Sequence, residues 1–330
     1  MDEEILQLLR DAPSTFISGE EISRRLKVSR TAVWKRIERL RGLGYGIEAS
    51  TRSGYRLIQS PDLLTPSEIK PLLKTRWMGK RIHHFQTIES TNSKAYQLAL
   101  EGADEGEVVL SESQEKGRGR LGRQWFSPPS LNLYFSVILR PKIPPHQAPL
   151  ITLMAAVATA DAIRKFSGLL PQIKWPNDIL LRGRKVAGLL NEIHSEMDRI
   201  HFVILGIGVN LNMDERNFSK EIRSIATSLK IEMGETVSRK AFLQSLLLEL
   251  ERWYSIFLEE GSAVVLNAWR NRAEIKGREV KVTSFGETVV GTAVDVDSDG
   301  ALILETGDGK QRRVMAGDIE YRKWKVEGRR

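Results

Sequence analysis

Near the start of the chain, apolar residues recur at helical spacing and are separated by short polar breaks. Serine is a favoured N-cap residue, and two short helices joined by three or four residues are typical of a helix-turn-helix. Helices are predicted at 3–10, from Ser18 onward, and at 30–41 after Ser29. A polar hairpin is predicted at 47–57. The pattern predicts a winged helix-turn-helix over residues 1–60.

Residues 61–273 alternate between apolar, β-branched runs and longer helical runs. Because several strand-like runs also follow one another directly, the order favours an α+β domain around a mixed sheet. Strands are expected at 80–86, 107–113, 131–140, 172–174, 179–181, 186–193 and 200–209, and helices at 93–101, 148–167, 239–260 and 262–272.

The last part of the chain, 274–330, is all-β in texture. Strands are expected at 280–284, 288–296, 302–305 and 312–314, divided by turns rich in glycine and aspartate. This length and spacing indicate a small SH3-like β-barrel. The predicted fold class is therefore multidomain α+β, with a winged helix, a central mixed-sheet domain and a C-terminal barrel.

Composition narrows the class of protein. The 330 residues include no cysteine, which excludes disulfides and thiolate zinc sites. Their net charge of +8 favours a polyanionic partner. The five histidines show no metal-ligand spacing, so no metal site is assigned to them. The acidic N-terminus is no signal peptide, and the longest apolar stretch is too short for a membrane span. A cytoplasmic protein without a membrane partner is expected.

Residues 117–125 interleave three glycines with three arginines and end in a tryptophan. The spacing is formally that of a dinucleotide-binding loop, but a strand follows it instead of the required helix. Guanidinium groups on a flexible loop offer planar forks to phosphate or carboxylate. The loop is predicted to grip an anionic ligand, with a solvated basic turn as the alternative.

The helix at 30–41 would enter the major groove of DNA. Residues 1–58 hold eleven basic and eight acidic side chains, a net charge of only +3, so one copy should bind DNA weakly. A helical oligomerisation module remains the alternative. The residues predicted to contact DNA are Arg30, Thr31, Trp34 and Lys35 on the helix, with Thr51 and Arg52 at the wing tip.

Five separated motifs then occur in the order found in the biotin protein ligases. They lie at 89–93 with Gln114, 117–128, 174–178, 184–192 and 206–210. With a winged helix before them and a small barrel after them, the whole chain resembles the family of bifunctional biotin protein ligases and biotin-operon repressors.

The resemblance implies an ATP- and Mg²⁺-dependent ligase that converts biotin to biotinyl-5′-AMP. A lysine of a biotin carboxyl carrier protein, part of an acetyl-CoA carboxylase, then takes the biotin. The adenylate would also act as corepressor, joining two chains into a homodimer that binds the operator DNA of biotin genes.

Site residues are carried over from the matching motifs. Biotin would be bound by Ser90, Thr91, Asn92, Gln114, Arg118, Gly119, Arg120 and Lys185, and the nucleotide by Arg118, Arg120, Trp125, Asn177 and Asn210. Lys185, Arg118 and Asp178 would be the catalytic residues, with Asp178 activating the acceptor lysine. On their own, residues 90–92 are also a plausible helix N-cap.

One departure concerns the segment that covers the adenine in the regulatory ligases, where an aromatic side chain is expected. Residues 214–230 contain no tryptophan, Ile225 stands near the expected place, and Phe218 is the available substitute.

Three further functions stay open. They are a ligase without regulatory DNA binding, a ligand-sensing transcription factor on a degenerate ligase domain, and a lipoate ligase. The retained loop, Lys185 and Asp178 disfavour the transcription factor. The residues of the motifs at 117–128 and 174–178 disfavour the lipoate ligase.

Overall fold

The computed structural model describes residues 1–273, 275–284 and 286–321. The last nine residues of the predicted C-terminal domain lie outside this description. The chain divides into two compact units, Met1–Leu72 and Leu73–Arg330, so the three-domain division with a boundary near residue 60 remains a prediction.

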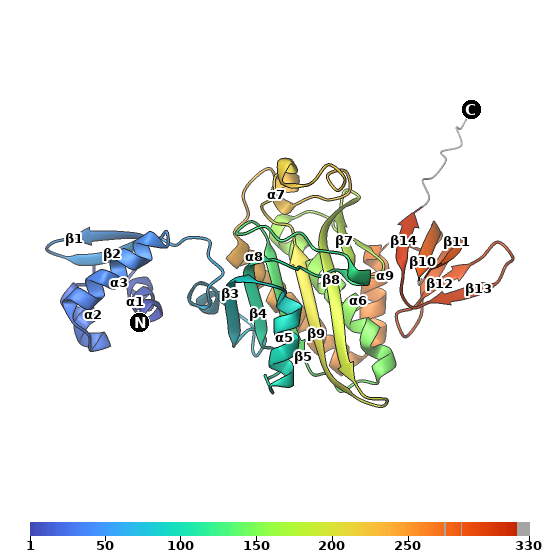
Figure 1. Cartoon of the computed structure of the whole chain (residues 1–330), viewed down its shortest axis with the longest axis horizontal. Helices are drawn as coiled ribbons and strands as arrows, with labels where there is room; N and C mark the ends of the chain where they lie inside the picture. The colour runs from blue at the N-terminus through green and yellow to red at the C-terminus, as the bar shows by residue number, and fades with distance from the viewer. Residues whose placement is uncertain (274, 285, 322–330) are drawn as a thin grey trace. The chain divides into compact units, whose positions relative to one another are not determined.

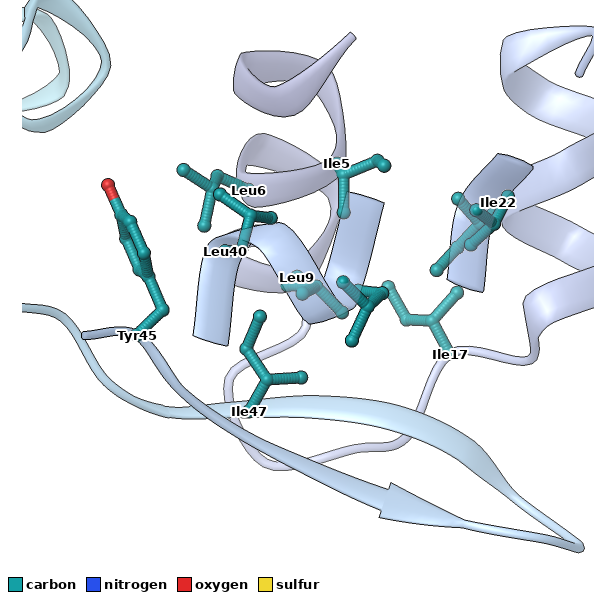
Figure 2. Close-up of a cluster of buried hydrophobic side chains, with 10 residues drawn as sticks. Ile5, Leu6, Leu9, Ile17, Ile22, Leu40, Tyr45 and Ile47 are labelled. Carbon is teal, nitrogen blue, oxygen red and sulfur yellow. The ribbon is translucent and has the colours of Figure 1, made fainter. Parts of the chain in front are cut away.

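The first unit contains the predicted helix-turn-helix and its hairpin. Ser18 and Ser29 cap the second and third helices, accepting hydrogen bonds from the backbone N–H groups of Glu21 and Ala32. Figure 2 shows the apolar core that the helices and the hairpin share. The elements are α1 (Asp2–Asp11), α2 (Gly19–Leu26), α3 (Arg30–Gly42), β1 (Gly46–Ser50), β2 (Gly54–Gln59) and α4 (Pro66–Ile69).

The segment after the hairpin packs with the first unit through Glu68 in α4. This buried carboxylate accepts a hydrogen bond of 2.7 Å from the Tyr45 hydroxyl and forms an ion pair with Arg10. Burial, together with the carboxylate, raises the pKa of the Tyr45 phenol above its ordinary range. These contacts hold residues beyond the wing to the helical core.

The second unit is built on a mixed sheet of seven strands in the order β3-β4-β5-β9-β8-β7-β6. Strands β3 and β4 are parallel and the other neighbours are antiparallel. The strands are β3 (Ile82–Ile88), β4 (Val108–Gln114), β5 (Leu133–Leu139), β6 (Gln172–Lys174), β7 (Asp178–Leu181), β8 (Arg184–Ser195) and β9 (Ile200–Val209). The predicted mixed sheet is confirmed.

Helices pack against this sheet as Figure 1 shows. Helix α5 contacts β4, β5 and β9, whereas α6 contacts β8 and is itself packed against α8 and α9. The helices are α5 (Thr91–Leu100), α6 (Ala148–Ser167), α7 (Leu229–Met233), α8 (Arg239–Glu260) and α9 (Ser262–Ala273). The short α7 was not predicted, because five residues are too few for a periodic pattern. No helix in the described part of the chain is long and apolar enough to cross a membrane.

The C-terminal part forms the expected antiparallel sheet, with one strand more than predicted. Its order is β13-β12-β11-β10-β14. The strands are β10 (Glu279–Ser284), β11 (Glu287–Val296), β12 (Leu302–Glu305), β13 (Gln311–Val314) and β14 (Asp318–Tyr321). The unpredicted strand β14 pairs with β10 and brings Asp318 to the ligand cavity described below.

Glu251 in α8 anchors residues 76–78, close to the start of the second unit. Its buried carboxylate accepts hydrogen bonds from the backbone N–H groups of Arg76, Trp77 and Met78, at 2.7, 2.9 and 2.9 Å. Three donors directed at one carboxylate offset the cost of burying its charge.

We expect Glu251→Ala to lower the free energy of unfolding of the second unit by about 2–4 kcal/mol, because three buried donors lose their acceptor. Urea denaturation followed by circular dichroism measures the change. Glu259→Ala, at an exposed position of the same helix, is the matched control and should have little effect. Equal stability of the two variants would contradict the anchoring role.

Candidate active site

One cavity in the second unit is lined by side chains from separate parts of the sequence. They come from the start of α5, the end of β4, strands β7 to β9, and residues 117–125 between β4 and β5, which we call the glycine–arginine loop. The predicted residues that line the cavity are Ser90, Thr91, Asn92, Gln114, Arg118, Gly119, Arg120, Trp125, Asn177, Asp178 and Lys185. The structure thus brings together nearly the whole predicted ligand site.

A neutral polar cluster forms one end of the cavity. The Gln114 side-chain oxygen accepts hydrogen bonds from the Thr91 backbone N–H at 2.9 Å and the Thr91 hydroxyl at 3.2 Å. The Ser136 hydroxyl in β5 donates to the Asn92 side-chain oxygen at 2.6 Å, and its oxygen lies 2.9 Å from the Thr91 hydroxyl oxygen. Ser90 occupies the N-cap position of α5 but makes no capping hydrogen bond with its side chain, so capping does not explain this serine.

Asn92 lies directly against the backbone of β9. A Cβ atom at Gly206 would come within 2.1 Å of the Asn92 side-chain oxygen, so only glycine fits opposite this asparagine. The Asn92 amide nitrogen donates to Glu192 in β8 at 2.8 Å. The first glycine of the motif at 206–210 therefore has a steric role in the site.

The glycine–arginine loop folds back on itself and directs its cations to different partners. The Gly119 N–H donates to the Arg123 carbonyl at 2.7 Å, and the Trp125 N–H donates to the Gly117 carbonyl at 2.8 Å. Arg118 pairs with a carboxylate oxygen of Glu192 at 2.7 Å. The loop is thereby tied to the sheet.

The other two arginines of the loop reach the unpredicted strand β14 and the turn before it. Arg120 donates to the Asn177 side-chain oxygen at 3.2 Å and to the Gly317 carbonyl at 3.3 Å. Burial lowers the pKa of the Arg120 guanidinium, while the charges of nearby aspartates oppose this shift. Arg123 forms an ion pair with Asp318. The C-terminal domain therefore contributes to the cavity wall.

Lys185 lies between an aromatic ring and a carboxylate. Its ammonium nitrogen is 2.7 Å from an Asp178 carboxylate oxygen and 5.2 Å from the centre of a Trp125 ring. Trp125 packs on bare backbone, because a Cβ atom at Gly208 or Gly188 would approach the indole to 2.5 or 2.9 Å. The indole thus forms a flat wall beside the cation.

Comparison with known proteins identifies the family of the chain. Models of three families match the chain: "HTH domain" at residues 2–56, "Biotin/lipoate A/B protein ligase family" at 84–210 and "Biotin protein ligase C terminal domain" at 276–322. The bifunctional ligase/repressor BirA of Bacillus subtilis is 40% identical over 96% of this chain and 97% of its own length. The chain belongs to the family of bifunctional biotin protein ligases and repressors.

Other relatives agree. The bifunctional ligase/repressor BirA of Escherichia coli is 31% identical over 94% of both chains. A structure of the biotin protein ligase from Aquifex aeolicus in complex with biotin and ATP is similar with a TM-score of 0.64 and 26% identity, covering 74% of this chain and 100% of that one. The predicted family, fold class and enzyme class are confirmed.

Not every predicted site residue reaches the cavity. Asn210 is buried, and its amide nitrogen donates to the Thr227 carbonyl at 3.0 Å. It does not line the cavity, so its nucleotide-binding role stays a prediction. In the first unit, the predicted DNA contacts Arg30, Thr31, Trp34, Lys35, Thr51 and Arg52 are all exposed.

The segment expected to cover the adenine adopts a different arrangement from the one predicted. Phe218 is only 4% exposed and does not line the cavity, so it is not placed to cover a ligand. Residues 225–227 form an isolated β-bridge with Lys185: the Lys185 N–H donates to the Ile225 carbonyl, and the Thr227 N–H donates to the Lys185 carbonyl. The segment thus supports the lysine through its backbone.

Sequence reasoning assigned no role to several residues with polar contacts in the site, among them Ser136, Glu192 and Asp318. Ser136 is a polar residue in an otherwise apolar strand, which is a usable signal, and Glu192 ends a recognised motif. Asp318 gave no signal, because its strand was not predicted. The role of each can be recognised only from its contact with a residue distant in sequence, which the folded sheets bring beside it.

We expect Gly208→Ala to reduce ligase activity by at least about tenfold, because the new methyl group displaces Trp125 and the lysine beside it. Steady-state assays of the purified variant measure this. Gly307→Ala, where a Cβ atom meets nothing within 4 Å, is the control and should retain activity. Full activity of Gly208→Ala would show that the indole is not needed in this position.

Proposed function

We propose that this protein activates biotin with ATP and transfers it to a lysine of a biotin carboxyl carrier protein. The observation that carries the proposal is the composition of one cavity, in which a neutral polar cluster lies beside Arg118, Arg120 and Lys185. Biotin has the matching composition, with a neutral ureido head and a carboxylate at the end of an aliphatic tail.

The neutral cluster suits the ureido head. A ureido group needs both donors and acceptors, and Ser90, Thr91, Asn92 and Gln114 supply hydroxyl and amide groups of both kinds without a net charge. The head would lie at this end, and the carboxylate would point toward the cations of the loop.

In the first step, a carboxylate oxygen of biotin attacks the α-phosphorus of ATP. The new acyl–phosphate bond gives biotinyl-5′-AMP, and the bond to the leaving pyrophosphate breaks. Negative charge gathers on the phosphate oxygens, where Arg118, Arg120 and Lys185 would offset it. Trp125 would form the wall beside the adenylate.

In the second step, the ε-amino group of the acceptor lysine attacks the acyl carbon, and AMP leaves. An amine attacks only when it is neutral, so a proton must first be removed. Asp178 is the carboxylate proposed to accept it, since it lines the cavity beside Lys185 at 2.7 Å.

Mg²⁺ is expected to accompany ATP, because this ion is commonly held by substrate phosphates and one or two carboxylates. Among the described residues, no group of three or more His, Cys, Asp or Glu side chains could hold a metal ion. Asp178 and Asn177, which line the cavity beside Lys185 and Arg120, would supply oxygen ligands for Mg²⁺ from the protein. Bound there, the ion would neutralise phosphate charge.

Pyrophosphate release with biotin and with lipoate tests the proposal. We expect release that depends on biotin, is negligible with lipoate, and falls by about 100-fold or more in Lys185→Ala, because removing a cation from a transition-state charge commonly costs that much. Lys142→Ala, at an exposed position that does not line the cavity, should behave like the parent. Equal turnover of both acids would overturn the assignment.

The repressor half of the proposal rests on a dimer. Strand β7 pairs with β8 only as far as Gly188, so among the described residues 190–195 of β8 have a strand partner on one side alone. An unpaired edge is a ready site for pairing with a second copy. We propose that the adenylate, bound between the loop and β8, favours this pairing and so places two winged helices on one palindromic operator.

Adenylate should therefore promote dimerisation and DNA binding more than biotin alone. Analytical ultracentrifugation with each ligand measures the first effect, and a gel shift with DNA from upstream of biotin-synthesis genes measures the second. The double variant Arg30→Ala/Trp34→Ala should still dimerise but lose the gel shift, because both side chains are exposed at the start of α3. A dimer that forms equally without ligand would refute the coupling.

A further inference from the structure

Glu192 uses both oxygens of its carboxylate within the ligand site. One oxygen lies 2.7 Å from a guanidinium nitrogen of Arg118, and the other accepts the Asn92 amide N–H at 2.8 Å. The side chain is 22% exposed, so it is partly shielded from water. One acidic group therefore links the neutral end of the cavity to the cationic loop.

The contact with Asn92 fixes the orientation of an amide. The Asn92 oxygen accepts from Ser136 at 2.6 Å, while its nitrogen donates to Glu192. The bare backbone of Gly206 on the third side leaves no room for the side chain to rotate freely. A carboxylate can only accept, so its presence forces the amide nitrogen toward β8.

The contact with Arg118 occupies a cation that the proposed reaction needs. One terminal nitrogen of this guanidinium pairs with Glu192, and the other donates to the Ser93 hydroxyl at 3.3 Å. Arg118 is 49% exposed, so it lies at the mouth of the cavity. An arriving phosphate or carboxylate must draw the guanidinium away from Glu192 or share it.

We infer that Glu192 is a positioning residue of the ligand site. It holds the Asn92 amide in one orientation and keeps Arg118 at the mouth until an anionic group of the ligand takes the guanidinium. The exchange replaces one ion pair with another, so the Arg118 guanidinium has an anionic partner in either state. This inference rests on the proposed function for the identity of the ligand.

Hydrogen exchange of the glycine–arginine loop, measured by mass spectrometry, tests whether Glu192 holds the loop in the protein without ligand. In Glu192→Gln we expect the loop amides, including those of Gly119 and Trp125, to exchange about two- to fivefold faster, the range of a half-exposed ion pair. The control is Glu89→Gln, which removes the exposed 2.6 Å ion pair with Lys116 just before the loop and should leave the loop unchanged.

Adding biotin and magnesium-ATP tests the exchange. Loop protection should then become equal in the parent and in Glu192→Gln, because the ligand has replaced the carboxylate. The KM for biotin should rise severalfold while kcat of adenylate formation stays within about twofold, since preorganisation is lost but no group at the reacting atoms is changed.

Two results would overturn the inference: unchanged loop exchange in ligand-free Glu192→Gln, or a lowered kcat with an unaltered KM. If the variant does not fold, Arg118→Gln breaks the same ion pair from the exposed side and should speed loop exchange equally. The ligand-free measurement needs no enzymatic activity, so a parent protein that fails to activate biotin refutes the proposed function and still leaves the Glu192 contact tested.

Discussion

Four cations, Arg118, Arg120, Arg123 and Lys185, line one cavity of the second unit, and their mutual repulsion is the constraint on which the arrangement of the site depends. Like charges at short range repel, and burying them costs free energy unless each has a partner. The structure meets the constraint with internal partners: Asp178 for Lys185, Glu192 for Arg118, Asp318 for Arg123, and the Asn177 side chain with the Gly317 carbonyl for Arg120. The charge of each cation is thus balanced or hydrogen-bonded within the protein, and under the proposed function a ligand would bind by exchanging with these partners.

The partners come from separate elements, which explains why the site needs the whole unit. The three carboxylates are on β7, β8 and β14, so the central sheet and the C-terminal sheet both contribute to the balance of charge. The sheet also has to come close to the ligand. Residues 188, 206 and 208 are glycines, which lets Trp125 and Asn92 pack directly against the backbone of β8 and β9. The polar cluster and the cations therefore lie over the same two strands.

Sequence reasoning succeeded where a signal is local and failed where it depends on pairing between distant segments. Ser18 and Ser29 cap their helices as predicted, because a cap is defined within a few residues. The loop cations were recognised because glycine and arginine alternate over a short stretch. Two of their acidic partners were not: Glu192 ends a recognised motif but was given no role, and Asp318 lies on a strand that was not predicted. Phe218 was proposed as a lid from residue type alone, but packing buries it.

The same ion pairs offer a physical route from ligand binding to assembly. Arg118 is joined to Glu192, which stands on the stretch of β8 whose outer edge has no strand partner among the described residues. Under the proposal, an anionic ligand that pairs with Arg118 would break this connection between the loop and the edge. Such a coupling would need no long pathway, because Glu192 contacts Arg118 with its side chain and belongs to the proposed pairing edge through its backbone. The chemistry of biotin activation and the control of assembly would then share a single structural element, the strand β8.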